Sequence, residues 1–180
     1  MTTTPITLSR LYTFPVKSMK GIRQSQSHAG ETGLGFDRNF MITDETGKFI
    51  TARRYPQMVL FTPVLLSNGI YLRSPEGSGA TILFEDFRPD HLPCEVWGNH
   101  FTSLLAPEKI NQWLCQFFDI PVQLRWLSPQ STRRVKKFPD TAVSFADGYP
   151  YLVVNEASFR EVQRRCGAGI KIEQFRGNII

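Results

Sequence analysis

Near the N-terminus, a lysine, a hydroxyl and an arginine stand beside turn residues, where together they could bind one anion. Lys17 and Ser18 follow Pro15, which fixes its own φ and keeps the chain extended as a first strand ends. An ammonium supplies charge and a neighbouring hydroxyl supplies a rotatable donor, so the pair suits a phosphate. Arg38 begins the next expected strand, and Asp37 can fix its guanidinium for the same anion. A surface turn and a surface salt bridge are the alternative interpretations.

A second set of polar groups lies toward the C-terminus. Gly148 and Tyr149 stand in a loop whose backbone N–H and C=O groups are open to a ligand. Arg176 and Asn178 are two residues apart, so on a strand both side chains point to one face. A guanidinium beside an amide suits a polar heterocycle or a phosphate, although an ordinary edge-strand pair would look the same. Arg53 and Arg54 follow an expected hairpin strand and could face the same cleft as Arg38 or simply solvent.

The sequence indicates neither a nucleophile nor a metal site. His28, His91 and His100 have no metal-ligand spacing, and no serine, histidine and acid arrangement is legible. The cysteines are three in number and far apart, which argues against a disulfide framework and fits a reducing compartment. We therefore predict no catalytic residue and no metal ligand, and we interpret Cys115 and Cys166 as core thiols on helices.

The composition is that of a globular protein with excess positive charge. Of 180 residues, 41% are hydrophobic and 21% charged, which suits one domain, with or without a small subdomain. No apolar run approaches the roughly 18 residues of a membrane helix, and the N-terminus lacks a signal-peptide pattern, so a cytoplasmic location is expected. The net charge of +5 suggests an anionic partner. No nucleic-acid motif accompanies the basic residues 133–137, which we interpret as a solvated loop; a phosphate-bearing small ligand is favoured.

Short strands separated by turn signals dominate the pattern. Residues 44–47 and the pair Asn68-Gly69 each predict a hairpin turn. Strands are expected at residues 7–16, 40–43, 48–51, 64–66, 70–72, 80–85, 94–98, 122–127, 150–154 and 170–175.

Two helices interrupt the strands. Residues 107–118 carry one apolar stripe at helical spacing. Residues 156–166 follow Asn155, a capping residue, and precede Gly167, which can take the left-handed closing conformation. Residues 128–145 look like a long polar loop. The predicted fold class is α+β, mostly antiparallel and barrel-like.

The motifs occur in an order that resembles one family, the MOSC proteins, named for the C-terminal domain of molybdenum-cofactor sulfurase. The resemblance covers almost the whole chain and is greatest to bacterial proteins of the YcbX type, relatives of the mitochondrial amidoxime-reducing component. The matching segments are Pro15-Val16-Lys17-Ser18-(x2)-Gly21, Gly33-Leu34-(x2)-Asp37-Arg38, Thr51-Ala52-Arg53, Asp147-(x2)-Pro150, Asn155-Glu156-Ala157-Ser158 and Phe175-Arg176-(x)-Asn178.

The resemblance implies binding of the molybdenum cofactor, and detoxifying reduction of N-hydroxylated compounds such as hydroxylaminopurines, amidoximes and hydroxylamines. Electrons would come from an iron–sulfur or flavoprotein donor, with no nucleic-acid or membrane partner. The implied cofactor-binding residues are Lys17, Ser18 and Arg38 on the pterin phosphate, Gly148 and Tyr149 through loop backbone, and Arg176 and Asn178 on the pterin.

The family's fold would place residues 1–38 and 128–180 in one β-barrel domain, with residues 39–127 as an inserted α/β subdomain. In this family a cysteine downstream of the Phe-Arg-x-Asn segment ligates molybdenum, and bacterial relatives add a ferredoxin-like domain that can hold a 2Fe-2S cluster. Neither follows Ile180. We therefore expect an incomplete barrel, the N-terminal part of a reductase that is inactive alone. The alternative hypothesis is a non-catalytic anion- or phosphate-binding module from a truncated gene.

Overall fold

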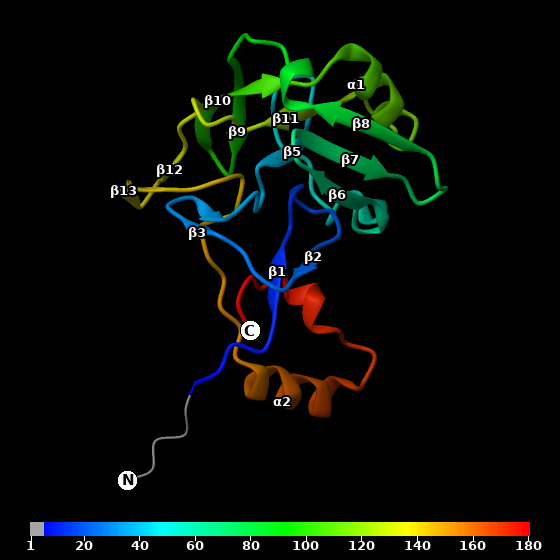
Figure 1. Cartoon of the computed structure of the whole chain (residues 1–180). Coiled ribbons are helices and arrows are strands. Elements are labelled where there is room, and N and C mark those ends of the chain that lie inside the picture. The colour runs from blue at the N-terminus through cyan, green and yellow to red at the C-terminus, as the bar shows by residue number, and fades with distance from the viewer. Residues whose placement is uncertain (1–5) are drawn as a thin grey trace.

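Antiparallel strands and two α-helices make up the computed structural model, which describes residues 6–180 (Figure 1). The larger sheet has the strand order β5-β11-β10-β9, and a second sheet has the order β6-β7-β8. Every pair of named strands is antiparallel, so the predicted α+β, mostly antiparallel class is confirmed. The strands of these two sheets are β5 (Phe40–Asp44), β6 (Thr62–Leu66), β7 (Gly69–Arg73), β8 (Gly79–Leu83), β9 (Leu92–Val96), β10 (Asn99–Leu105) and β11 (Val122–Trp126).

The main core lies between the two sheets and helix α1 (Glu108–Cys115), which packs against β11 and β8. Ile110 and Leu114 bury the apolar stripe that the sequence predicted for this helix. The helix is shorter than expected, because Pro107 is its N-cap and the chain turns after Cys115. The hairpin predicted from Asn68-Gly69 is confirmed, but its turn residues are Ser67 and Asn68, because Gly69 begins β7 and pairs with Leu66.

The last residues of the chain lie beside strand β1. Strand β1 (Leu11–Thr13) pairs with β2 (Ile22–Gln24) along one edge and meets the last residues of the chain along the other. The backbone N–H of Ile180 donates to the carbonyl of Arg10 at 3.0 Å, and that of Tyr12 donates to Asn178 at 2.9 Å. The C-terminus is therefore drawn beside β1 in Figure 1.

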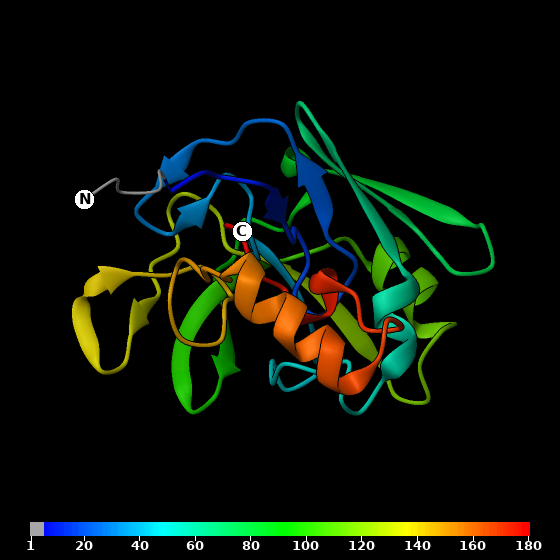
Figure 2. The ribbon, with the colours of Figure 1, turned by 90° about the horizontal axis from the view of Figure 1, so that it is seen from below.

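Helix α2 (Glu156–Cys166) has the predicted bounds and cap. The side chain of Asn155 accepts a hydrogen bond from the backbone N–H of Ser158 at 3.0 Å. Gly167 ends the helix at a φ of 97°, but its ψ of 160° is not that of the left-handed helix that we expected. Figure 2 shows α2 lying across the end of the molecule that carries the C-terminus. Phe159 anchors this helix in a small second core with Tyr12, Phe14, Ile172 and Ile180.

Several predicted elements are wrong. The strand expected at 170–175 is a 3-10 helix, η3 (Ile172–Phe175), because it turns Ile172 into the small core. Residues 150–154 form only an isolated bridge from Val153 to Ile179, and residues 48–51 only bridges from Lys48 and Phe49. Elements absent from the prediction are β2, β10, β3 (Ala29–Gly30), β4 (Gly33–Leu34), β12 (Arg134–Val135), β13 (Phe138–Ala142), and the 3-10 helices η1 (Pro56–Leu60) and η2 (Phe84–Asp86). The β12–β13 hairpin occupies the region predicted as a loop.

Neither α-helix in the described part of the chain is long and apolar enough to cross a membrane.

Candidate functional site

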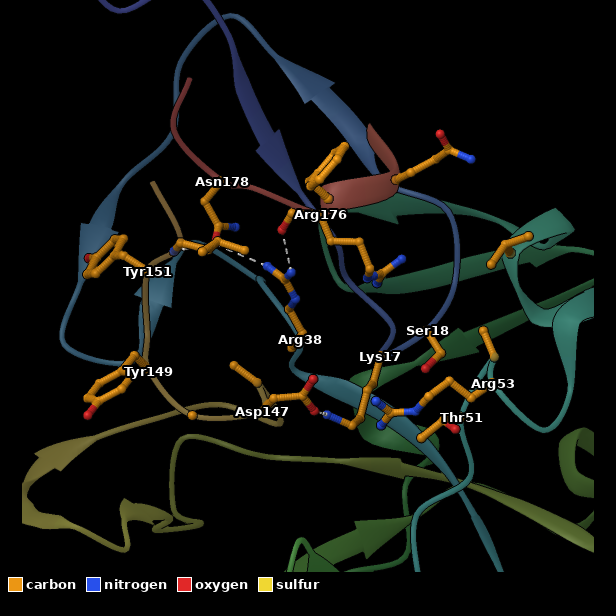
Figure 3. A pocket seen from close by; sticks show the side chains of 17 residues that line it. Lys17, Ser18, Arg38, Thr51, Arg53, Asp147, Tyr149, Tyr151, Arg176 and Asn178 are labelled. Carbon is orange, nitrogen blue, oxygen red and sulfur yellow. Dashed lines mark hydrogen bonds and ion pairs between the residues drawn. The ribbon is translucent and has the colours of Figure 1, made fainter. Parts of the chain in front are cut away.

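A cavity of about 550 Å³ opens where the two ends of the chain meet the start of β5 (Figure 3). Its walls come mainly from residues 17–18, 51–53, 146–152 and 174–178, together with Arg38. All seven residues predicted from the sequence to bind the cofactor line it: Lys17, Ser18, Arg38, Gly148, Tyr149, Arg176 and Asn178. Segments that are more than a hundred residues apart in sequence therefore share one cavity.

The cavity is electropositive. Four cationic side chains line it, from Lys17, Arg38, Arg53 and Arg176, against one carboxylate, from Asp147. Guanidinium and ammonium groups form charge-assisted hydrogen bonds with phosphate oxygens, and several together favour an anion of more than one charge. The arrangement is thus suited to a phosphorylated ligand.

Lys17 is the most deeply buried cation of the cavity, with 5% of its surface exposed. Its Nζ donates to the carbonyl of Phe145 at 2.8 Å and to Oδ1 of Asp147 at 2.5 Å. Burial lowers the pKa of Lys17 to about 8; the charges of Arg133 and Arg38 act in the same direction, and Asp147 opposes them. An ammonium has three N–H donors, so one remains for a ligand.

Asp147 is the functional residue that sequence reasoning missed. Besides Lys17, its Oδ1 accepts a hydrogen bond from the indole N–H of Trp97 at 2.8 Å. Burial alone would raise the pKa of this carboxyl, but the charge of Lys17 and these two hydrogen bonds bring it below its usual value. Asp147 stands in one of the segments that match the family pattern, which is the signal that could have identified it.

Arg38 is held by three acceptors of the protein itself. Its Nη1 donates to Asp37 Oδ2 at 2.5 Å. Figure 3 shows the other two contacts, from Nη1 to Asn178 Oδ1 at 3.2 Å and from Nη2 to the carbonyl of Arg176 at 2.8 Å. The predicted anchoring by Asp37 is confirmed. Since a guanidinium has five N–H donors, two remain for a ligand. Arg38 lies in the turn before β5 rather than on the strand, which begins at Phe40.

Asn178 positions other groups and is 1% exposed. Its Oδ1 accepts from Arg38 and from the backbone N–H of Leu152 at 3.1 Å, while its Nδ2 donates to the carbonyl of Tyr12 at 3.1 Å. The expectation that Asn178 and Arg176 share one face of a strand is wrong, because Arg176 ends η3 in the left-handed conformation. The two residues line the cavity nonetheless.

Arg176 has one hydrogen bond to the protein and one buried nitrogen without a partner. Its Nη1 donates to the carbonyl of Met19 at 2.6 Å, whereas its Nη2 is buried with no acceptor in the described chain. Burial, followed by the charge of Arg38, lowers its pKa to about 10. The guanidinium carbons of Arg38 and Arg176 lie 4.5 and 4.4 Å from the centre of the Phe14 ring. This aromatic support holds two cations close together.

Three residues of the cavity have an unusual backbone. Ser18, Arg38 and Arg176 have φ values of 68°, 51° and 55°, and they are three of the five non-glycine residues with positive φ in residues 6–180. Such conformations cost on the order of 1–3 kcal/mol each and cluster at functional sites. Ser18 takes this φ within a turn closed by the Met19 N–H and the Val16 carbonyl at 3.1 Å. The strain supports a ligand-binding role for this cavity.

Arg133 corrects the interpretation of residues 133–137 as a solvated loop. It is 5% exposed, and its Nη1 donates to the carbonyls of Ser144 and of Ala146, the latter at 2.6 Å. Burial lowers its pKa to about 10. Arg133 therefore fixes the loop that brings Asp147 into the cavity.

The lining residues fit the phosphorylated, ring-bearing part of a molybdenum cofactor. Cationic donors and the unsatisfied Arg176 Nη2 suit a phosphate, and tyrosines and Phe175 offer apolar surface to a heterocycle.

None of the three cysteines lines the cavity: Cys94 is buried in β9, Cys115 is half-buried in α1, and Cys166 is exposed, not a core thiol as predicted. No cluster of three metal-ligating side chains occurs within residues 6–180. The described chain thus offers the cofactor's metal no thiolate.

The chain belongs to the family of the MOSC N-terminal β barrel domain, whose model matches residues 5–121. It is 26% identical over 186 residues to mitochondrial amidoxime-reducing component 1 of Mus musculus, covering 97% of this chain and 55% of the mouse protein. The corresponding Homo sapiens protein is 27% identical over 188 residues, with 97% and 55% covered, and human component 2 is 24% identical over 186 residues, with 97% and 56% covered.

The chain spans about half the length of these curated relatives. Among solved structures, a solution structure of a Bordetella bronchiseptica protein aligns with a TM-score of 0.47 at 11% identity, covering 65% of this chain and 98% of that one.

Proposed function

We propose that this chain is the cofactor-binding N-terminal portion of a molybdenum-dependent oxidoreductase that reduces N-hydroxylated compounds. The observation that carries the proposal is the electropositive cavity in which Lys17, Arg38 and Arg176 converge. Membership in the MOSC N-terminal family and likeness to amidoxime-reducing components support an oxidoreductase related to the molybdenum cofactor. Hydroxylaminopurines, amidoximes and hydroxylamines are the substrates that we infer.

Each residue has a role in this proposal. Lys17, Ser18 and Arg38 bind the phosphate of the pterin, each through donors that the protein leaves unused. Arg176 turns its unpartnered Nη2 toward the same ligand. Gly148 and Tyr149 present loop backbone to the ring system. The bound cofactor would supply two-electron reduction of an N–O bond, while the protein supplies binding and orientation.

Asp147 and Asn178 act through other residues. Asp147 keeps Lys17 protonated by favouring the charged form of a buried amine. Asn178 fixes the direction of the Arg38 fork. Both would position the donors before the ligand arrives, which lowers the cost of ordering them on binding.

The remaining expectations stay predictions. An iron–sulfur or flavoprotein donor would supply electrons. The division into residues 1–38, 39–127 and 128–180 concerns domains of the whole family fold, and its first five residues lie outside the described ones. The curated relatives are named mitochondrial, so a cytoplasmic location is likewise a prediction for this chain.

The test is the cofactor content of the 180-residue chain after expression in a host that makes the molybdenum cofactor. Pterin is measured by the fluorescence of its oxidised derivative, and molybdenum by mass spectrometry. We expect pterin in the parent protein, and a several-fold loss in Lys17→Met and Arg176→Gln. Lys109→Gln is the control, since Lys109 is exposed on α1 and far from the cavity lining. Equal pterin in all four proteins would contradict the proposal.

One observation favours a second candidate, a non-catalytic module for phosphorylated ligands. No described cysteine lines the cavity, so the ligand that it holds need not carry a metal. Purified protein without pterin or molybdenum that binds a phosphorylated compound through Lys17 and Arg176 would support this function over the first.

A further inference from the structure

A second cationic groove, of about 340 Å³, lies between the β9–β10 turn and the β12–β13 hairpin. Its lining includes His100, Arg133, Arg134 and Lys136, and no residue of its lining is acidic. None of these four takes part in an ion pair within residues 6–180. The groove thus gathers positive charge that the described chain does not neutralise.

Arg133 forms the buried part of the groove. Its Nη1 is engaged by two backbone carbonyls and its guanidinium carbon lies 5.3 Å from the centre of the Phe101 ring, but its Nε is buried with no acceptor. A buried donor without a partner is costly, so native structures rarely leave one unsatisfied. The Nε–H of Arg133 is therefore a donor for which the described chain supplies no acceptor.

Lys136 and Arg134 form the exposed rim. A Cβ placed on Gly98 would lie 4.0 Å from Nζ of Lys136, which puts the ammonium over the β9–β10 turn. Arg134 donates through Nη1 to the carbonyl of Asp140 at 3.1 Å, which leaves the rest of its guanidinium available. The nearby carboxylate of Glu95 accepts the N–H of Gly98 at 2.6 Å. Two exposed cations and one buried guanidinium therefore surround the same space.

We propose that this groove is a second anion site, which binds one phosphate or carboxylate group through Arg133, Arg134 and Lys136. A phosphate or carboxylate group accepts several charge-assisted hydrogen bonds at once, so one such group can bind all three cationic side chains. The group comes either from a free anion or from an acidic side chain of another protein. The proposal does not depend on molybdenum or on the first cavity.

Titration of the ¹⁵N-labelled chain with inorganic phosphate, at constant ionic strength and followed by NMR, tests the site. Phosphate also enters the first cavity, but backbone amides separate the two events. Asn99, His100 and Thr132 report the groove, whereas Ser18 and Gly148 report the cavity. We expect saturable shifts at the groove amides with their own dissociation constant.

The double variant Arg134→Gln/Lys136→Gln removes the rim charges while sparing the buried Arg133. We expect the dissociation constant at the groove amides to rise by about tenfold or more, as the loss of two charge-assisted contacts implies. The cavity amides should keep their parent value, which also shows that the variant is folded. Lys137→Gln is the matched control, since Lys137 is exposed on the same hairpin and does not line the groove.

Hexaglutamate in place of phosphate separates the two sources. Binding at least about tenfold tighter than phosphate assigns the groove to acidic side chains of a partner, and equal or weaker binding assigns it to a free anion. Non-saturating shifts with both probes overturn the proposal. So do shifts that are the same in the parent and in the double variant.

Discussion

The ammonium of Lys17 donates to the carboxylate of Asp147 at 2.5 Å across 130 residues of sequence. One partner is buried and the other exposed: the side chains retain 7% and 68% of their accessible surface. The pair joins the turn that contains Lys17 to the loop that contains Asp147, and Arg133 fixes that loop by donating to the carbonyl of Ala146. Asp147 is the one acidic residue that lines the electropositive cavity, and its carboxylate stabilises the charge of the buried Lys17 amine.

The charge state of Lys17 makes stability depend on pH. The pKa of Lys17 is about 8 in the folded chain and about 10.4 when unfolded. Between these values the unfolded state binds more protons, so the free energy of unfolding gains from this group as pH rises. Below pH 8 both states are protonated and the cost of burying the charge is present in full.

We therefore expect the free energy of unfolding of the parent, measured relative to that of Lys17→Met, to rise by about 2 kcal/mol between pH 7 and pH 10. Urea denaturation of both proteins at the two pH values measures the difference, in which titrations common to both cancel. Lys109→Met, at an exposed position on α1, should run parallel to the parent. If Lys17→Met runs parallel as well, Lys17 is not desolvated.

Arg38 forms an ion pair with Asp37, whose carboxylate is buried with 1% of the residue exposed. Arg38→Gln should cost about 3–5 kcal/mol, since it leaves that carboxylate uncompensated. Asp37→Asn in the same chain should recover much of the loss. Denaturation of the two single variants and the double variant gives the coupling energy. Additive effects would show that the pair does not interact.

Arg53 is the one exposed cation of the cavity, and its guanidinium carbon lies 4.8 Å from the centre of the Trp97 ring. Arg53→Gln should raise several-fold the phosphate dissociation constant that is measured at the cavity amides. Its free energy of unfolding should stay within about 0.5 kcal/mol of the parent value. Arg54 is its matched control, because it is exposed, adjacent and outside the cavity lining. Equal losses in Arg53→Gln and Arg54→Gln would mean that only overall charge matters.

Gly21 allows the backbone to pass close to the Phe14 ring, against which the guanidinium groups of Arg38 and Arg176 lie. A Cβ at this position would lie 2.4 Å from Cε1 of Phe14, a ring that is 1% exposed. Gly21→Ala should therefore cost about 1–3 kcal/mol by overpacking. Gly169→Ala, with nothing within 4 Å of its Cβ, should be neutral or slightly stabilising in the same denaturation experiment. A neutral Gly21→Ala would show that the Phe14 ring is free to move.

The sequence predicted elements whose signals are local. The hairpin at Asn68 and the Asn155 cap each depend on a few neighbouring residues, and both occur, although the hairpin turn lies one residue earlier than predicted. The segment predicted as a strand at 170–175 is a 3-10 helix instead, because Ile172 is buried in one cluster with Tyr12 of β1 and with Phe14. Strand β10 was missed because its first half carries little apolar surface.

The site divides in the same way. The seven residues that line the cavity were predicted from an order of motifs that resembles the MOSC family, because each motif alone fits a surface turn or an ordinary salt bridge equally well. The partner of Lys17 could not be predicted, since no local rule links positions 130 residues apart. Nor could the burial of Arg133, because only the fold shows which residue of a basic run turns inward.

The pairing of the two chain ends has a consequence for biosynthesis. Strand β1 needs Asn178 and Ile180 along one edge, and the Arg38 fork needs Asn178 as an acceptor. A ribosome releases β1 long before these partners, at about 5–20 residues per second. The main core can fold during that interval, but the cavity cannot. The cavity is therefore completed only once Asn178 has been translated and released, and a nascent chain stalled earlier would hold the main core without the complete cavity.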